Sequence, residues 1–156
     1  MQRRRFLGGA LAGLGAGVAP QVQAEETFEV TRTKEEWKAR LSDLEYRVMR
    51  QEGTEPAFSS PLHDLKTEGT YHCRGCDQPL YASEHKFDSG TGWPSFYKPV
   101  AEDAVATKRD WKLIIPRTEV HCARCGSHLG HIFDDGPPPT GKRHCINGVS
   151  LVFREA

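Results

Sequence analysis

Two C-x-x-C pairs constrain the fold of this chain more than any other feature of its sequence. Cys73 and Cys76 form the first pair, and Cys122 and Cys125 form the second. Each pair presents two sulfurs on a tight turn, and four thiolates complete a closed tetrahedral shell around a structural zinc ion. If both pairs bind one ion, the long segment between them becomes a closed loop. Closing a long loop removes much conformational entropy from the unfolded chain.

Two disulfides and a redox-active C-x-x-C are the alternatives to a metal site. The chain has five cysteines, so at least one thiol stays unpaired within a monomer. Neither pair lies at the junction of a strand and a helix, where a thioredoxin-like motif occurs. We therefore predict that the four paired cysteines bind one structural Zn²⁺ ion per chain.

Residues 1–24 have the composition of an export signal. Arginines 3–5 precede an apolar stretch rich in Gly and Ala, and Val22-Gln23-Ala24 is typical of a cleavage site. The stretch is too short and too rich in glycine to span a membrane stably. The order Arg-Arg-x-Phe-Leu resembles a bacterial twin-arginine signal, which exports folded proteins, so the thiols would bind zinc before export. We predict a twin-arginine-type signal peptide at 1–24, one domain at 25–156 and a periplasmic location; a frayed basic terminus is the alternative.

The composition of the remaining chain limits its partners. Hydrophobic residues make up 37% of the sequence, which is enough for one modest core. The full chain has 21 Lys and Arg and 21 Asp and Glu, so loss of the signal arginines leaves a weak acidic excess. Such a charge balance argues against a nucleic-acid partner. We also expect the domain to be a monomer that does not bind membranes.

The pattern of apolar residues predicts a helical N-terminal extension followed by a mainly β domain. Thr33 and Glu36 have the spacing of a capping box, and one helix is predicted from there until Gly53. The apolar positions at helical spacing are Trp37, Leu41, Leu44 and Val48. After Gly69, short β-prone runs alternate with turn residues, which predicts antiparallel strands. The predicted strands are 70–72, 80–82, 95–97, 111–115, 119–121, 131–133 and 149–153.

Cys145 is the cysteine that lies outside both pairs. Arg143 precedes it by two positions and Asn147 follows it by two. In an extended segment, residues two apart project from the same face, so the three side chains are expected to point into one site. A guanidinium beside a thiol favours the nucleophilic thiolate. Two other readings stay open: a zinc-stabilised module that binds a partner, with Cys145 a buried structural thiol, and a thiol peroxidase or oxidant sensor.

Two further stretches are dense in polar and aromatic residues, Phe87-Asp88-Ser89-Gly90-Thr91-Gly92-Trp93-Pro94-Ser95-Phe96 and His128-Leu129-Gly130-His131-Ile132-Phe133-Asp134-Asp135-Gly136. Taken alone, each fits a structural role. Together with the C-x-x-C pairs and Arg-x-Cys-x-Asn, they make residues 33–153 resemble the B-type methionine sulfoxide reductases, which reduce the R epimer of methionine sulfoxide in proteins. That resemblance implies two antiparallel sheets around a core, with the four-cysteine zinc site.

The resemblance also implies a role for each residue of the site. Cys145 would attack the sulfoxide sulfur, with Arg143 holding it as a thiolate. Either histidine would donate a proton to the oxygen, and Asp135 would orient an imidazole or a water. The implied site residues are Cys145, His128, His131, Asp135, Arg143 and Asn147 for catalysis, and Trp93 and Phe96 for substrate contact. Asn147 would bind the oxygen or the peptide, and Trp93 would take the methyl group against its ring.

One position departs from the pattern of many relatives. They carry a second, resolving cysteine where this chain has Thr91. With four cysteines bound to metal, no partner remains for an intramolecular disulfide with Cys145. We therefore predict that the product, a sulfenic acid on Cys145, is reduced directly by an external thiol donor such as a thioredoxin-like protein.

Overall fold

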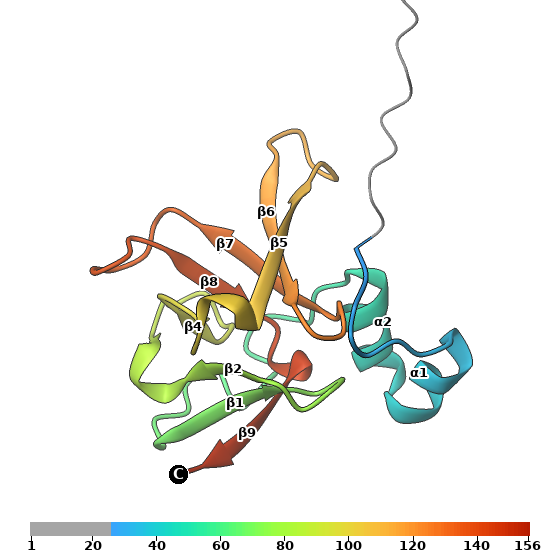
Figure 1. The fold of residues 1–156 in the computed structure, drawn as a ribbon. Coiled ribbons are helices and arrows are strands. Elements are labelled where there is room, and N and C mark those ends of the chain that lie inside the picture. Colours follow the sequence, from blue (N-terminus) through green and yellow to red (C-terminus); the bar gives the residue numbers. More distant parts are fainter. Residues whose placement is uncertain (1–25) are drawn as a thin grey trace, which may run out of the picture.

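The computed structural model describes residues 26–156 (Figure 1). The predicted signal peptide at 1–24 lies outside this range, so its prediction is untested. Within the described range, no helix is both long enough and apolar enough to cross a bilayer.

Two short helices replace the single helix predicted near the N-terminus. They are α1 (Lys34–Arg40) and α2 (Asp43–Gln51). The capping box of Thr33 and Glu36 is present, but Ser42 and Glu45 form a second one, and Leu41 between the helices is extended. The apolar period continues across this break, so the sequence pattern alone predicts one helix. Val48 and Met49 of α2 are buried in the domain.

The strands form two antiparallel sheets, as predicted. Their bounds are β1 Gly69–Cys73, β2 Pro79–Ala82, β3 Lys86–Phe87, β4 Ser95–Phe96, β5 Val105–Asp110, β6 Arg117–Cys122, β7 His128–Phe133, β8 Arg143–Ile146 and β9 Leu151–Glu155. The smaller sheet has the order β2-β1-β9, and the larger has the order β3-β4-β8-β7-β6-β5. Figure 1 shows the two sheets as separate layers, with α1 and α2 at one flank. The mainly β fold class is therefore confirmed.

The strand predicted at 111–115 is wrong. These residues form the tip of the β5–β6 hairpin, and Trp111, Leu113, Ile114 and Ile115 are all exposed. The preceding residues, 105–110, form β5 instead, although most of that strand is polar. β5 is an edge strand, so it needs no continuous apolar face, and its register with β6 is set by backbone hydrogen bonds. The apolar pattern in the sequence therefore marks the hairpin tip rather than the strand itself.

An aromatic cluster fills part of the core between the sheets. Phe96 stacks on Tyr81 with a centroid distance of 4.4 Å, and Tyr71 meets the same ring edge-on at 5.0 Å. All three side chains are fully buried. Phe96 was predicted to contact substrate, and this prediction is wrong. It follows Ser95 in β4, and neighbouring strand residues point to opposite faces, so Phe96 points into the core.

Candidate active site

Cys145 lies at the centre of the larger sheet. It is on β8 and is paired with Ser95 of β4 on one side and with His131 of β7 on the other. Directly opposed residues of an antiparallel pair have their Cβ atoms about 4.5–5.5 Å apart. The sheet register therefore places Cys145 and His131 side by side on neighbouring strands, and both residues line the same pocket, although a long connection between β7 and β8 separates them in the chain.

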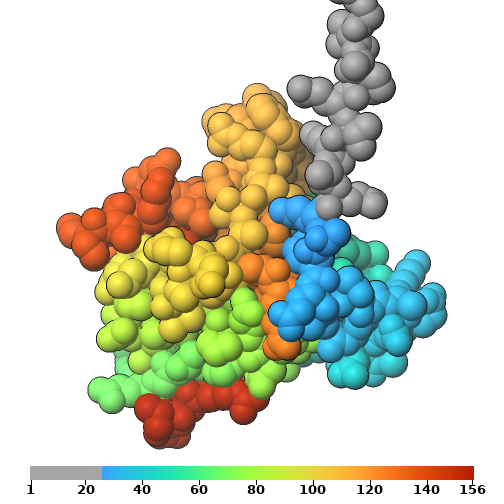
Figure 2. All heavy atoms as spheres, viewed as in Figure 1, coloured from blue at the N-terminus to red at the C-terminus, as the bar shows by residue number. Residues whose placement is uncertain are grey.

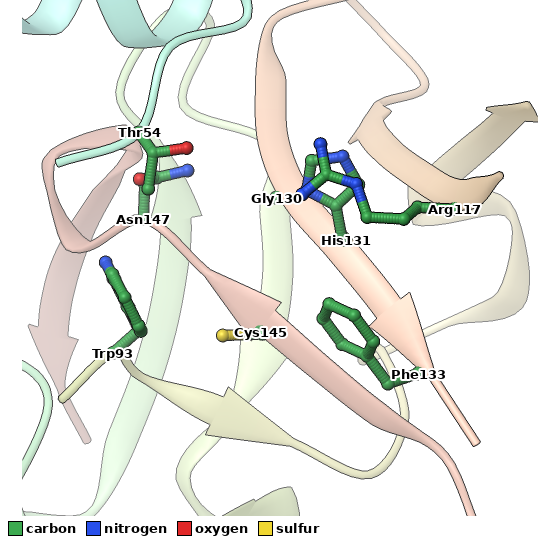
Figure 3. Close-up of a pocket in the computed structure, with 8 residues that line it drawn as sticks. All are labelled: Thr54, Trp93, Arg117, Gly130, His131, Phe133, Cys145 and Asn147. Atoms are coloured by element: carbon green, nitrogen blue, oxygen red, sulfur yellow. The ribbon is translucent and has the colours of Figure 1, made fainter. Parts of the chain in front are cut away.

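A small pocket opens beside Cys145 (Figure 3). Its lining residues are Thr54, Trp93, Arg117, Gly130, His131, Phe133, Cys145 and Asn147. In Figure 3 the sulfur of Cys145 lies between the rings of Trp93 and Phe133. The pocket volume is about 130 Å³, which is well below the ~300–1,000 Å³ of a site for a drug-sized ligand. The pocket therefore fits the end of one side chain, with apolar rings at two sides and polar groups at the others.

Arg143 forms an ion pair with Asp135 on the Cys145 side of the site. Its Nε and Nη2 donate to the two Asp135 oxygens at 2.9 and 3.0 Å. The guanidinium also lies over the Phe133 ring, 4.4 Å from the centroid. Asp135 was predicted to orient an imidazole or a water, but the structure pairs it with Arg143. It acts on the site through that arginine and through its own charge, which raises the pKa of Cys145.

The thiol of Cys145 is not held as a thiolate in the resting protein. Burial raises its pKa above the ordinary 9.0, although the Arg143 charge and a hydrogen bond from Thr91 each act to lower it. Asp135 adds a further upward contribution and neutralises part of the Arg143 charge. Arg143 thus acts in the predicted direction, since it lowers the pKa of Cys145, but burial has the larger effect and the net change in pKa is upward.

His131 is the histidine that lines the pocket. Asp110 binds its ring and Arg117 binds Asp110, and the sequence analysis had predicted a role for neither residue. Its Nε2 lies 2.7 Å from Asp110 Oδ2, and Arg117 Nη2 donates to the same oxygen at 2.7 Å. The Lys112 backbone N–H, His131 and Arg117 hold the pKa of Asp110 well below its usual range, so Asp110 is a carboxylate. Nε2 of His131 must then donate, which leaves Nδ1 as the acceptor of the neutral ring. Burial lowers the pKa of His131 below 6.5 despite Asp110, so the ring is neutral at pH 7.

His128 has a different environment. It is 2% exposed, it is not among the residues that line the pocket, and its Nδ1 lies 2.6 Å from Glu119 Oε1. The other oxygen of Glu119 binds His121 Nδ1 at 2.9 Å. Burial alone would raise the pKa of Glu119, but the bonds from both histidines lower it to about 2. The two histidines of the motif, predicted as equivalent candidates, therefore differ in their access to the pocket.

Glu119→Gln is expected to destabilise the fold by about 3 kcal/mol at pH 7, because it removes a buried charge from its two partners. The native carboxylate has a lowered pKa, so its contribution is complete above pH 4.5 and is lost as the pH falls toward 2. Urea unfolding at several pH values measures both effects. The exposed Glu84, which contacts His85, supplies the matched control Glu84→Gln, with little expected change. An equal loss of stability in both variants would contradict the assignment.

Asn147 lines the pocket, but most of its amide is used to hold the site together. Its Oδ1 accepts from the Glu55 backbone N–H at 2.9 Å, and its Nδ2 donates to the Leu129 carbonyl at 2.9 Å. One amide hydrogen remains for a ligand. The Glu55 carbonyl in turn accepts from Trp93 Nε1 at 3.2 Å, which fixes the plane of the indole beside Cys145. Sequence reasoning missed Glu55 because its contacts come from residues far along the chain.

The four paired cysteines meet, as predicted, at one point between the sheets. Their sulfurs all lie within 4.8 Å of one another. Cys73 Sγ is 3.7 Å from Cys125 Sγ, and Cys76 Sγ is 3.5 Å from Cys122 Sγ. A tetrahedral ion with metal–sulfur bonds of about 2.3 Å requires sulfurs about 3.8 Å apart, whereas a disulfide requires about 2.05 Å. The cluster therefore fits a metal ion and does not fit two disulfides.

Comparison with known proteins agrees with this arrangement. The family model of the SelR domain matches residues 41–155. The peptide methionine sulfoxide reductase MsrB of Methanosarcina barkeri is 54% identical over 80% of this chain and 88% of its own length. The corresponding proteins of Thioalkalivibrio sulfidiphilus and Pseudomonas fluorescens are 55% and 52% identical, over 80% and 79% of this chain and 90% and 95% of their own lengths. The chain therefore belongs to the SelR family of peptide methionine sulfoxide reductases, which are oxidoreductases.

Proposed function

We propose that this protein reduces the R epimer of methionine sulfoxide in oxidised proteins, with Cys145 as the nucleophile. The observation that carries the proposal is the pairing of Cys145 with His131 across β7 and β8, at a pocket bounded by the Trp93 and Phe133 rings. A thiol, a proton carrier and an apolar surface for a methyl group are the three elements that sulfoxide reduction by a cysteine requires.

The proton for the departing oxygen comes from the thiol itself. Because Cys145 rests as a thiol and His131 as a neutral base, the ring accepts the thiol proton as the sulfur attacks, and then returns it to the oxygen. The methionine sulfur is reduced by two electrons and the Cys145 sulfur is oxidised by two. The oxygen moves from one sulfur to the other, and the products are methionine and a protonated cysteine sulfenic acid.

Trp93 and Phe133 discriminate between the epimers. Contacts between a methylated sulfur and an aromatic ring are favourable, by about 0.3–1.5 kcal/mol each. With the methyl group against these rings, only one configuration at sulfur directs the oxygen toward His131 and the free Asn147 amide hydrogen. Phe133 takes the second aromatic position, which the sequence analysis had assigned to Phe96.

The sulfenic acid is reduced by an external thiol, such as that of a thioredoxin-like protein. Within residues 26–156, every cysteine other than Cys145 belongs to the four-cysteine metal site. The residue of the preceding loop that contacts the Cys145 sulfur is Thr91. Zn²⁺ is the ion that the four-thiolate cluster would hold, in a closed structural site without an open position for substrate. The protein would work as a monomer in the periplasm, exported by a twin-arginine signal at residues 1–24.

The pH dependence of kcat/KM is expected to reflect the protonation states of both Cys145 and His131. Activity should be highest around neutral pH, because the pKa of His131 is lowered from its usual range and that of Cys145 is raised from its usual range. It should fall at lower pH as the ring binds a proton, and at higher pH as the pair loses its proton. Asp110 raises the pKa of His131, so Asp110→Asn should move the acid limb to lower pH. The exposed pair of Asp134 with Lys142 offers Asp134→Asn as a control, and an unmoved limb in Asp110→Asn would refute the relay.

The direct test of the function uses the two separated epimers of a blocked methionine sulfoxide, with dithiothreitol as the reductant. Formation of methionine from the R epimer and not from the S epimer is expected. Turnover of the S epimer alone, or of neither epimer, would refute the proposal. Reduction of hydrogen peroxide in place of the sulfoxide would favour the thiol peroxidase reading.

A further inference from the structure

The large apolar side chains that are more than half exposed are concentrated in two places. In residues 26–156 they are Phe58, Trp111, Leu113, Ile114 and Ile115, with exposures from 57% for Leu113 to complete exposure for Ile114. Four of them lie on residues 111–116, which we call the hairpin tip. Figure 2 shows the β5–β6 hairpin projecting above the body of the molecule. Exposed apolar groups that gather at one place mark a binding surface.

The hairpin tip adjoins two residues of the site. The residues at its two ends, Asp110 and Arg117, are paired with each other, and Arg117 lines the pocket while Asp110 binds His131. The tip therefore begins and ends on groups that border the site of the reaction.

The other exposed ring lies at the opposite side of the pocket. The Phe58 backbone N–H donates to the Gly92 carbonyl at 2.8 Å, directly before Trp93. A side chain at Gly92, which has a φ of 86°, would meet the Phe58 ring at 2.7 Å. Apolar surface is thus present on both sides of a pocket that admits one side chain.

The charges around the hairpin tip do not favour an anionic lipid surface. Lys108 and Lys112 both bind the carboxylate of Glu52, and Arg109 lies over the Trp111 ring at 6.0 Å from its centroid. The tip itself, residues 111–116, has Lys112 as its only charged residue beside four exposed apolar side chains. Its surface is therefore mainly apolar.

We propose that the hairpin tip binds apolar residues next to the methionine sulfoxide in an extended, unfolded segment of the substrate. The inference rests on the proposed function. When one side chain of a polypeptide enters the pocket, the residues on each side of it must leave across the rim, past Trp93 or past Arg117, which Phe58 and the hairpin tip adjoin. Methionine is usually buried among apolar residues, so the segment that presents a buried methionine sulfoxide after unfolding carries apolar neighbours. Such a segment would bury the exposed Leu113 and Ile114 side chains on binding.

The test compares wild-type protein with the double variant Leu113→Ser and Ile114→Ser. The substrates are the R epimer of blocked methionine sulfoxide and two peptides that hold the same residue between leucines or between serines. For the leucine peptide the variant should have a KM about tenfold higher with unchanged kcat, which corresponds to about 1.4 kcal/mol of lost binding. Both proteins should handle the blocked residue and the serine peptide equally. Val100→Ser, which changes an exposed apolar residue outside the hairpin, is the matched control.

Each alternative result overturns the inference in a distinct way. If wild-type protein reduces the blocked residue but the variant keeps its KM for the leucine peptide, the hairpin tip does not bind substrate. Co-sedimentation of wild-type protein with phosphatidylglycerol vesicles, lost in the variant, would identify a membrane contact instead. A wild-type dimer that the variant dissociates in analytical ultracentrifugation would identify a second copy as the occupant. Absence of turnover of the blocked residue by wild-type protein would refute the proposed function itself.

Discussion

Cys145→Ser is expected to reduce the rate of methionine sulfoxide reduction by at least about a thousandfold, because loss of a nucleophile removes the covalent step itself. The hydroxyl of serine is far less ionisable than a thiol and cannot accept the oxygen as a sulfenic acid. The measurement is methionine formation from the blocked R epimer under saturating dithiothreitol. The control is the melting temperature of the variant, which should be close to that of the wild type since Cys145 is only partly buried and lies outside the metal cluster.

The same residue should carry the product of a single turnover. Mass analysis of wild-type protein after reaction with one equivalent of sulfoxide, without reductant, should find a trapped sulfenic acid on Cys145. A disulfide between Cys145 and any cysteine of the metal cluster would contradict the external-thiol route, and it would also question the metal assignment. Residual activity of Cys145→Ser near the wild-type value would remove the assigned nucleophile.

Removal of the metal is expected to unfold the protein. The four cysteines join the turn after β1 to the turn after β6, and the hydrophobic core includes three of them, Cys73, Cys122 and Cys125. Apparent binding free energies of structural zinc are about 10–16 kcal/mol, which matches or exceeds the ~5–15 kcal/mol net stability of a typical domain. Without the ion, the four sulfurs remain close together but lose the metal–sulfur bonds that connect the two turns.

The experiment replaces Cys125, a buried cysteine of the second pair, with serine. Circular dichroism should show loss of the cooperative melting transition, and metal analysis should fall from one zinc per chain to little or none. Treatment of wild-type protein with a strong chelator should give the same result, and added zinc should reverse it. Cys145→Ser serves as the matched control, with full zinc content. A folded, metal-free Cys125→Ser protein would refute a structural metal site.

The predicted fold class, two antiparallel sheets and the meeting of the cysteine pairs are confirmed. Local signals predicted the antiparallel strands and the paired cysteines, whereas the division into two sheets was implied by the family resemblance. Turn residues separate short β-prone runs, and C-x-x-C spacing brings two sulfurs together on one turn. The wrong predictions arose where one local sequence pattern is compatible with two different structures. The apolar residues at 111–115 are an exposed hairpin tip, and the continuous helical period from Trp37 to Val48 conceals a second capping box at Ser42.

Four of the predicted site residues do line one pocket: Cys145, Trp93, His131 and Asn147. Phe133 was also within reach of sequence reasoning, because it lies two residues after His131 on the same strand and so faces the same side. Asp110, Arg117 and Glu119 were not, because no spacing along the chain connects them to the histidines. Their contacts exist only once β5, β6 and β7 are paired in register.

The sequence by itself determined which residue types are present to carry the chemistry: one unpaired cysteine, two histidines in one motif and four cysteines in two pairs. Only the tertiary structure decided what state each of them is in. Burial raises the pKa of Cys145 above that of a free thiol, Asp110 selects the tautomer of His131, and Glu119 binds Nδ1 of the buried His128. The physical reason is that burial and neighbouring charges set the protonation state of a side chain, and both depend on residues that are distant in the chain and adjacent in the fold.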